Sequence, residues 1–211
     1  MITKKLFGKI SDNFNYGKEV YAYTLANDSI ELTVMEYGAT ILRARVNTPA
    51  GWRDTVCGYD TLRSYEGAEG YLGAVVGRIG NRICRGKFTL DGVEYTLPVN
   101  NGPNHLHGGP QGFQNKVWES REHEGGVEFM YYSEDGEQGY PGAVKTVARY
   151  EWTEECELRL TLTAESDAPT ILNLTNHAYF NLNGEGNGSI LGHTLMLNAS
   201  EYLPTDATQI P

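Results

Sequence analysis

The side chain in this sequence that is best placed to move a proton near neutral pH is His177. It lies in a run of hydrogen-bonding residues, from Asn173 to Asn181, that directly follows an apolar segment. Buried amides need partners, and either the hydroxyls of a sugar or a tightly organised turn would supply them. A histidine in such a place can act as a general acid. The residues alone leave a catalytic and a structural role for His177 open.

A second pair of histidines, His105 and His107, is separated by one residue. In an extended segment this spacing puts both side chains on the same face. Such a pair can form half of a metal site, which needs further ligands. No carboxylate or thiolate nearby in the sequence is an obvious candidate. A metal-dependent enzyme therefore stays an alternative that the sequence does not favour.

An arginine-rich loop precedes the histidine pair and contains Asn81 and Arg82 in the string GRIGNRICR. The string is no phosphate-binding loop, because it lacks the Lys-Ser/Thr ending and opens no helix. Arginine and amide side chains suit sugar hydroxyls, to which they can donate several hydrogen bonds. They can equally anchor a loop through backbone carbonyls, so both roles stay open.

A β-hairpin is predicted between the arginine-rich loop and the histidine pair. Asp91-Gly92 separates two alternating apolar runs, residues 88–90 and 93–97. A tight two-residue turn requires positive φ at both central positions, which Asp and Gly tolerate. A rigid hairpin that joins two polar loops can hold residues from both in one cleft. We therefore predict that an arginine of the first loop and a histidine of the second share one cleft.

Apolar residues elsewhere alternate with polar ones at a period of two, which indicates strands. The predicted strands are residues 30–34, 42–46, 117–121, 128–133, 144–150 and 158–162. Only residues 60–66 resemble a helical turn. No repeat or linker divides the chain, so we predict one all-β domain over residues 1–211, built as a sandwich.

Composition excludes several classes of partner. The 211 residues contain 17 basic and 27 acidic side chains, a net charge of −10, whereas nucleic acids and anionic membranes attract basic proteins. No apolar run approaches the roughly 20 residues of a membrane span, and no signal peptide is visible. The three cysteines are widely spaced and odd in number, which argues against a disulfide framework. We therefore predict a cytoplasmic protein. Nothing indicates its oligomeric state.

Five strings, taken in their order along the chain, resemble the aldose 1-epimerase (galactose mutarotase) family. They are GAVVGRIGNRI, GKFTLDGVEYTLPVNNGPNHLHGG, DGEQGYPG, LNLTNHAYFNLNG and YLPTDATQIP. The resemblance runs from Val34 to the last residue. No single string is decisive, and their number and order carry the signal.

The resemblance implies a large antiparallel β-sandwich of the galactose mutarotase type that binds a small-molecule hexose and needs no metal or organic cofactor. The implied reaction interconverts the α and β anomers of free hexoses such as glucose and galactose. By match to TNHAYFNL, His177 is the proton donor. By match to LHGG and GNR, His107 lies beside the sugar ring and Arg82 with Asn81 binds its hydroxyls. Tyr179 lines the same cleft.

The chain departs from the family pattern in length. It stops in the turn-like segment from Tyr202 to Pro211, and no acidic residue matches the family's catalytic glutamate or its sugar-binding aspartate. We therefore expect residues 1–211 to be the N-terminal two-thirds of a mutarotase-like domain, inactive alone. Two alternatives stay open: a non-catalytic or degenerate sugar-binding protein, and a hexose-6-phosphate 1-epimerase. For the latter, Arg78 and Arg85 would supply extra positive charge.

Overall fold

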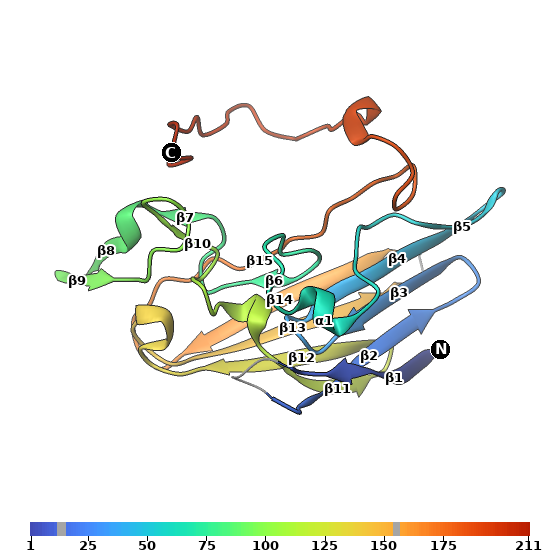
Figure 1. The fold of residues 1–211 in the computed structure, drawn as a ribbon, viewed down its shortest axis with the longest axis horizontal. Coiled ribbons are helices and arrows are strands. Elements are labelled where there is room, and N and C mark those ends of the chain that lie inside the picture. The colour runs from blue at the N-terminus through green and yellow to red at the C-terminus, as the bar shows by residue number, and fades with distance from the viewer. Residues whose placement is uncertain (12–15, 154–156) are drawn as a thin grey trace.

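The computed structural model describes residues 1–11, 16–153 and 157–211. Two antiparallel sheets form the body of the molecule (Figure 1). The first has the order β1 (Ile2–Lys9), β2 (Glu19–Ala26), β3 (Ile30–Met35), β4 (Thr40–Thr48) and β5 (Gly51–Asp54). The second has the order β11 (Glu119–His123), β12 (Gly126–Ser133), β13 (Val144–Trp152) and β14 (Leu158–Ser166). The predicted all-β antiparallel fold is thereby confirmed.

The alternation read from the sequence explains how the strands face the core. In β3, Ile30, Leu32 and Val34 are buried, whereas Glu31 and Thr33 are half-buried on the opposite face. The first predicted strand within the second sheet begins later than expected, at Glu119. The reason is that residues 117 and 118 pair with the connection between β3 and β4: Val117 bridges Tyr37, and Trp118 N donates to Glu36 O at 2.9 Å.

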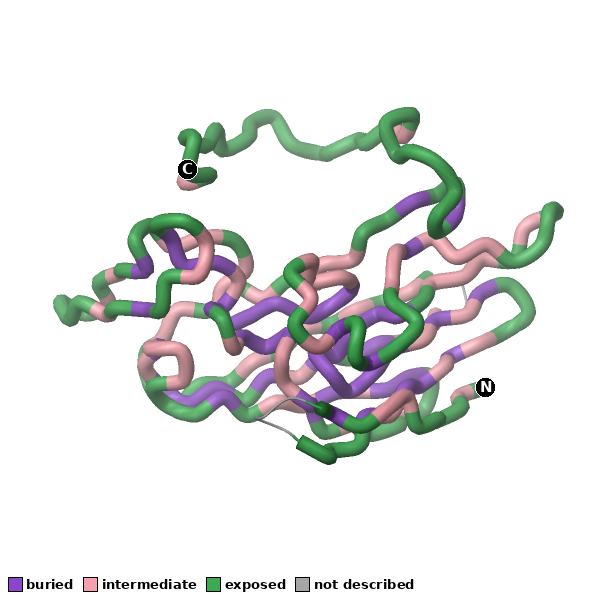
Figure 2. Tube along the Cα trace, in the orientation of Figure 1, coloured by how far each residue is buried: buried purple, intermediate pink, exposed green. Residues whose placement is uncertain are grey.

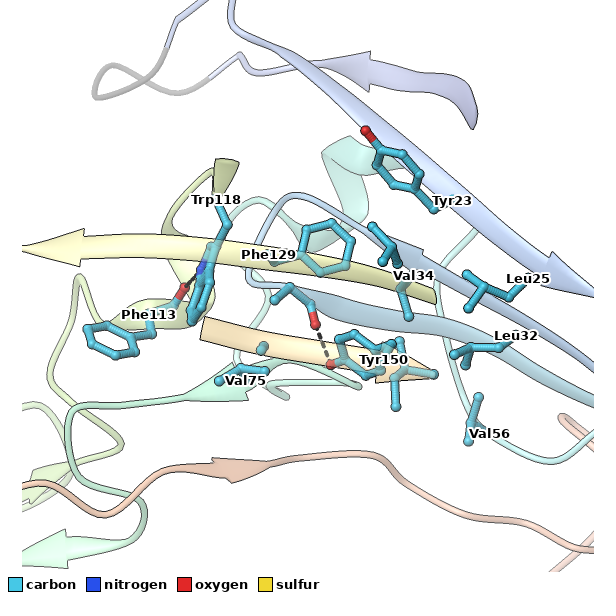
Figure 3. Packing of buried hydrophobic residues seen from close by; sticks show 14 residues of the cluster. Tyr23, Leu25, Leu32, Val34, Val56, Val75, Phe113, Trp118, Phe129 and Tyr150 are labelled. Atoms are coloured by element: carbon cyan, nitrogen blue, oxygen red, sulfur yellow. Dashed lines mark hydrogen bonds between the residues drawn. The ribbon is translucent and has the colours of Figure 1, made fainter. Parts of the chain in front are cut away.

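The two sheets enclose one apolar core, shown in Figure 3. Leu25, Leu32 and Val34 from the first sheet lie in the same cluster as Phe129 and Tyr150 from the second. Burying each such side chain contributes about 1.5–3 kcal/mol relative to exposure. The polar end of Tyr150 is satisfied, because its hydroxyl donates to Ala39 O at 2.6 Å. The sandwich is therefore a rigid platform for the loops above it.

Three two-stranded ribbons lie beside the sandwich (Figure 1). They pair β6 (Val75–Val76) with β15 (Thr175–Asn176), β7 (Arg82–Ile83) with β10 (His105–Leu106), and β8 (Lys87–Leu90) with β9 (Val93–Thr96). The last is the predicted hairpin, with Asp91 at φ 50° and Gly92 at φ 79° in the turn. Because β8 and β9 separate β7 from β10, the hairpin returns the chain to the arginine-rich loop.

In the described residues, helical structure is confined to short turns. The expected turn at residues 60–66 contains α1 (Leu62–Tyr65), whose N-cap Thr61 accepts from Ser64 N. The 3₁₀ turns are η1 (Cys84–Gly86), η2 (Phe113–Asn115), η3 (Glu137–Gly139) and η4 (Ile190–Gly192). No helix of the described residues is long and apolar enough to cross a membrane. From residue 182 onward the chain is mostly exposed, and Figure 2 shows it leading away from the sandwich.

Candidate functional site

The β7–β10 ribbon brings Asn81 and His107 together. Leu106 pairs with Arg82 in the ribbon, and beyond it His107 N donates to Asn81 O at 3.0 Å. The side chain of His107 adds a second bond, because Asn81 N donates to His107 Nδ1 at 2.9 Å. A ring nitrogen that accepts a hydrogen bond carries no proton. Neutral His107 therefore holds its proton on Nε2.

His177 is positioned by the β6–β15 ribbon. Its backbone extends the pairing of Asn176 with Val75, because His177 N donates to Ala74 O at 2.9 Å and Gly73 N donates to His177 O at 3.0 Å. Asn176 supports the same turn through its side chain, which donates to Gly73 O at 2.8 Å and accepts from Ala178 N at 2.9 Å. The amide of Asn176 therefore serves a tightly organised turn.

The two histidines meet at one cavity. The ring centroids of His107 and His177 lie 5.1 Å apart, with the ring planes at 89°. Tyr179 lies nearly parallel to His177, with centroids 4.9 Å apart. The cavity has a volume of about 630 Å³ and is open to solvent; its lining is Gly80, Asn81, His107 and residues 173–178. The predicted convergence of the two loops is thus what the structure contains.

Arg82 is held by two amide oxygens next to the cavity. Its Nε donates to Asn101 Oδ1 at 3.0 Å, and one terminal nitrogen donates to Asn81 Oδ1 at 3.1 Å. Because the guanidinium has five N–H donors, several remain for a ligand. Asn81 is exposed and Arg82 half-buried, so both side chains are accessible.

The surroundings of His107 keep it neutral. Burial, and to a smaller extent positive charge on His177 and Arg82, lowers its pKa from 6.5 to about 4. At neutral pH His107 is therefore an uncharged donor through Nε2. Two imidazoles this close do not both carry a proton readily.

The expectation that His105 and His107 share a face is wrong. His107 has φ 51°, which ends the extended segment and turns its ring away from that of His105. His105 is 0% exposed, with Nδ1 2.7 Å from Pro98 O and Nε2 2.7 Å from the Tyr140 hydroxyl. Both of its ring nitrogens are engaged in the interior. Within the described ranges, no group of three or more His, Cys, Asp or Glu side chains could hold a metal.

Arg78 does not reach the cavity either. It is 2% exposed, and its guanidinium donates to the carbonyls of Ser133, Glu134, Pro141 and Gly142 and to Ser133 Oγ. It therefore fastens the loops around β12 and β13. Of the two arginines considered for a phosphate group, only Arg85 is exposed.

Two residues of the site were missed from the sequence. Tyr71 contacts both histidines, with ring centroids 4.7 Å from His107 and 5.7 Å from His177. Asn101 anchors Arg82, as described above. The signal for Tyr71 was its place two residues before the GAVVG string, and that for Asn101 was its place in a run of turn-forming amides.

Comparison with known proteins gives consistent matches. The model of the family described as aldose 1-epimerase matches residues 21–211. Galactose mutarotase of Bos taurus is 41% identical over 211 residues, covering 100% of this chain and 60% of that protein. Aldose 1-epimerase of Escherichia coli (strain K12) is 37% identical over 198 residues, covering 92% of this chain and 57% of that protein.

A solved structure agrees with these sequence matches. The GalM/aldose epimerase homologue from C. elegans superposes with a TM-score of 0.84 at 34% identity, covering 89% of this chain and 58% of that one. The galactose mutarotase-like fold expected from the sequence is thereby confirmed. The chain spans about 60% of the length of the curated mutarotases it matches. On the match across residues 21–211, the chain belongs to the aldose 1-epimerase family.

Proposed function

We propose that the complete protein is an aldose 1-epimerase that interconverts the α and β anomers of free hexoses such as glucose and galactose. The observation that carries this proposal is the pair His107 and His177, with ring centroids 5.1 Å apart at an open cavity beside Arg82. A neutral histidine beside one that can carry a proton suits acid–base chemistry on an uncharged substrate.

The reaction needs one acid and one base. His177 donates a proton to the ring oxygen while a base removes the proton of the C1 hydroxyl. The bond between C1 and the ring oxygen breaks, and C1 becomes an aldehyde carbon. After rotation about the C1–C2 bond, the hydroxyl formed from the ring oxygen attacks the other face of the aldehyde. Its proton returns to His177, and the base returns a proton to the oxygen on C1. Each proton transfer of this kind contributes roughly 10²–10⁴ in rate.

The remaining site residues bind and orient the sugar. His107 donates from Nε2 to a sugar oxygen, because its Nδ1 is already occupied by Asn81 N. Asn81 and Arg82 donate to hydroxyls from the arginine-rich loop. Tyr179, which is 44% exposed, lines the cleft next to His177. A flat, rigid ring of this kind adds apolar contact area.

The base is a further part of the proposal. No Asp or Glu is present among the described residues that line the cavity. We propose that a glutamate outside residues 1–211 supplies the base, together with an aspartate that binds the sugar. Residues 1–211 are then the N-terminal two-thirds of a single sandwich domain and are inactive alone.

Polarimetry of freshly dissolved α-D-glucose tests the proposal on the complete gene product. The wild type should accelerate mutarotation, and His177→Ala should lower kcat by roughly 10²–10⁴. His123→Gln, which changes a histidine of β11 outside the cavity lining, is the matched control and should keep the wild-type rate. No acceleration by the complete wild type, or full activity of His177→Ala, would refute the assignment.

Two other readings are separated by the same assay. A non-catalytic sugar-binding protein would change its Tyr and Trp fluorescence with hexose but leave the mutarotation rate unchanged. A hexose-6-phosphate 1-epimerase would prefer glucose 6-phosphate, yet Arg78 is engaged with backbone carbonyls and offers no free charge for the phosphate. We therefore expect free hexoses to be preferred.

We also propose a cytoplasmic location. Cys57 and Cys84 are free thiols, which suits a reducing compartment. The net charge of −10 keeps nucleic acid an unfavourable partner. Fractionation of the source cells, followed by immunodetection, measures the location directly.

A further inference from the structure

Tyr71 lies in the loop that leads from α1 into β6, and its turn is tied to the backbone of His177. Tyr71 has φ 54°, and its carbonyl accepts from Ala74 N at 3.1 Å. Gly73 and Ala74 of the same turn make the two backbone hydrogen bonds to His177. Gly73 has no room for a side chain, because a Cβ there would lie 2.1 Å from Ile41 O. The turn is therefore fixed against both the sandwich and His177.

The ring of Tyr71 contacts both imidazoles. It stacks on His177, with centroids 5.7 Å apart and planes at 25°, and it meets His107 edge-on, with centroids 4.7 Å apart and planes at 69°. Burial raises the pKa of the Tyr71 hydroxyl above its ordinary value, so the ring is uncharged at neutral pH. Tyr71 also contributes to the lining of a separate cavity of about 550 Å³.

We propose that Tyr71 is a positioning residue that sets the orientation of His177 against His107 and stabilises the imidazolium form of His177; this inference rests on the proposed function. The face of an aromatic ring attracts a cation within about 6 Å of its centroid. A carboxylate in the same place would hold the proton of His177 more firmly and slow its transfer. An aromatic ring favours the charge without competing for the proton as a hydrogen-bond acceptor.

The described residues also place other charged and titratable groups around His177. His107 approaches from the turn after β10, and Tyr179 follows β15. Arg82 on β7 lies close enough to lower the pKa of both His107 and Tyr71. The described lining of the cavity adds no carboxylate to offset the charge of Arg82. Among the described residues, the aromatic faces of Tyr71 and Tyr179 are therefore the groups that can stabilise a proton on His177.

The test uses the complete gene product and two variants of Tyr71. Tyr71→Asn removes the ring and keeps a residue that tolerates positive φ, whereas Tyr71→Phe keeps the ring and removes only the hydroxyl. NMR titration of ¹³C/¹⁵N-labelled histidine measures the midpoint of His177, and polarimetry measures kcat and KM against pH. We expect Tyr71→Asn to lower the His177 midpoint and the alkaline limb of kcat/KM by about half a pH unit.

In the same variant kcat should fall roughly threefold to tenfold with KM nearly unchanged, whereas Tyr71→Phe should match the wild type. An unshifted midpoint in Tyr71→Asn, or an equal loss in Tyr71→Phe, would overturn the proposal. If Tyr71→Asn does not fold, phenylalanine and pentafluorophenylalanine at position 71 decide, because they share a shape and differ in the charge of the ring face. A downward shift in the fluorinated protein supports the proposal, and identical midpoints refute it.

Failure of the proposed function is distinguishable from failure of this inference. If the wild type does not accelerate mutarotation but the His177 midpoint still follows the ring at position 71, the reaction assignment is wrong and the role of Tyr71 stands. If mutarotation is fast and the midpoint does not respond, only the role of Tyr71 is wrong.

Discussion

At the scale of single residues, the site fixes the protonation state of one of its two histidines. His107 is kept neutral by burial and by the charges of its neighbours, and Asn81 N fixes which ring nitrogen holds the proton. His177 has its backbone bonded but lies with its ring at the cavity. A neutral imidazole and a second imidazole therefore stand side by side at the cavity.

Substitution of Asn101 tests whether sugar binding by Arg82 depends on its hydrogen bond to Asn101. Asn101→Ala removes the oxygen that accepts from Arg82 Nε, so the guanidinium loses part of its preset orientation. We expect KM for hexose to rise roughly threefold to tenfold with a smaller change in kcat, because a hydrogen bond to a charged group contributes about 1.5–3 kcal/mol when buried and less here. Asn101→Asp keeps the acceptor oxygen and should stay near the wild-type KM. Equal KM values in all three proteins would contradict the assignment.

The site residues that could be predicted from the sequence are those whose neighbours in the chain indicate a binding or catalytic role. His177 stands in its asparagine run, and Asn81-Arg82 stands next to the glycines of its loop. Tyr71 could not be found in this way, because its contacts to His107 and His177 join three segments that are distant in sequence. His105 was misplaced because periodicity assumes an extended chain, which the positive φ of His107 interrupts.

At the scale of elements, the short ribbons rely on close approach of backbone to backbone. Gly108 follows His107 at φ 80°, and a Cβ there would lie 1.7 Å from Gly77 O. Gly77 in turn accepts from Phe113 N at 3.2 Å, so it cannot move without disturbing η2. The position of His107 therefore depends on Gly108. In the sequence alone, Gly108 is indistinguishable from its neighbour Gly109.

Comparing Gly108 with Gly92 separates backbone strain from crowding. Gly92 has nearly the same φ, 79°, but nothing lies within 4 Å of a Cβ built on it. Gly92→Ala should therefore cost only the left-handed penalty, about 1–2 kcal/mol of unfolding free energy. Gly108→Ala should cost clearly more and abolish mutarotation, since Gly77 must be displaced. Chemical denaturation of both variants measures the difference, and equal losses would show that crowding at Gly108 is unimportant.

Part of the sandwich was predictable, whereas β1, β2, β5 and most of the ribbons were not. Alternation located β3, β4, β12, β13 and β14 because each has one face in the core. The two-residue strands β6, β7, β10 and β15 are too short to show any period. Of the three ribbons, the sequence predicted only the β8–β9 hairpin, because Asp91-Gly92 is typical of a tight turn.

At the scale of the whole molecule, the state of His107 links the site to stability. In the unfolded chain this histidine becomes protonated below about pH 6.5, whereas in the folded protein it becomes protonated only below about pH 4. Stability from this group is therefore complete above pH 6.5 and is lost as the pH falls toward 4. The unfolding free energy changes with pH by at most about 1.4 kcal/mol per pH unit for one proton. Solvent screening keeps the contribution of His107 below that limit. Burial lowers the pKa of His105 as well, which adds a slope of the same sign.

The His107→Asn variant should flatten this dependence. Unfolding free energies from urea titrations between pH 4 and pH 8 measure it, with the slope as the readout so that any uniform loss of stability cancels. The slope that remains in His107→Asn reports on His105 and on the carboxylates. A variant slope as steep as that of the wild type would show that His107 titrates normally in the folded protein.

The pairing of β6 with β15 has a consequence for the order in which the molecule takes shape. Val76 and Thr175 are partners although about a hundred residues separate them, whereas the sheets grow by hairpins between neighbours. Closing so long a loop carries an entropic cost that local contacts do not, so distant pairings form late. On the ribosome, Tyr71, Arg82 and His107 emerge well before His177. Assembly of the site therefore waits for long-range contacts such as this one, and mutarotation by the complete protein would report that they have formed.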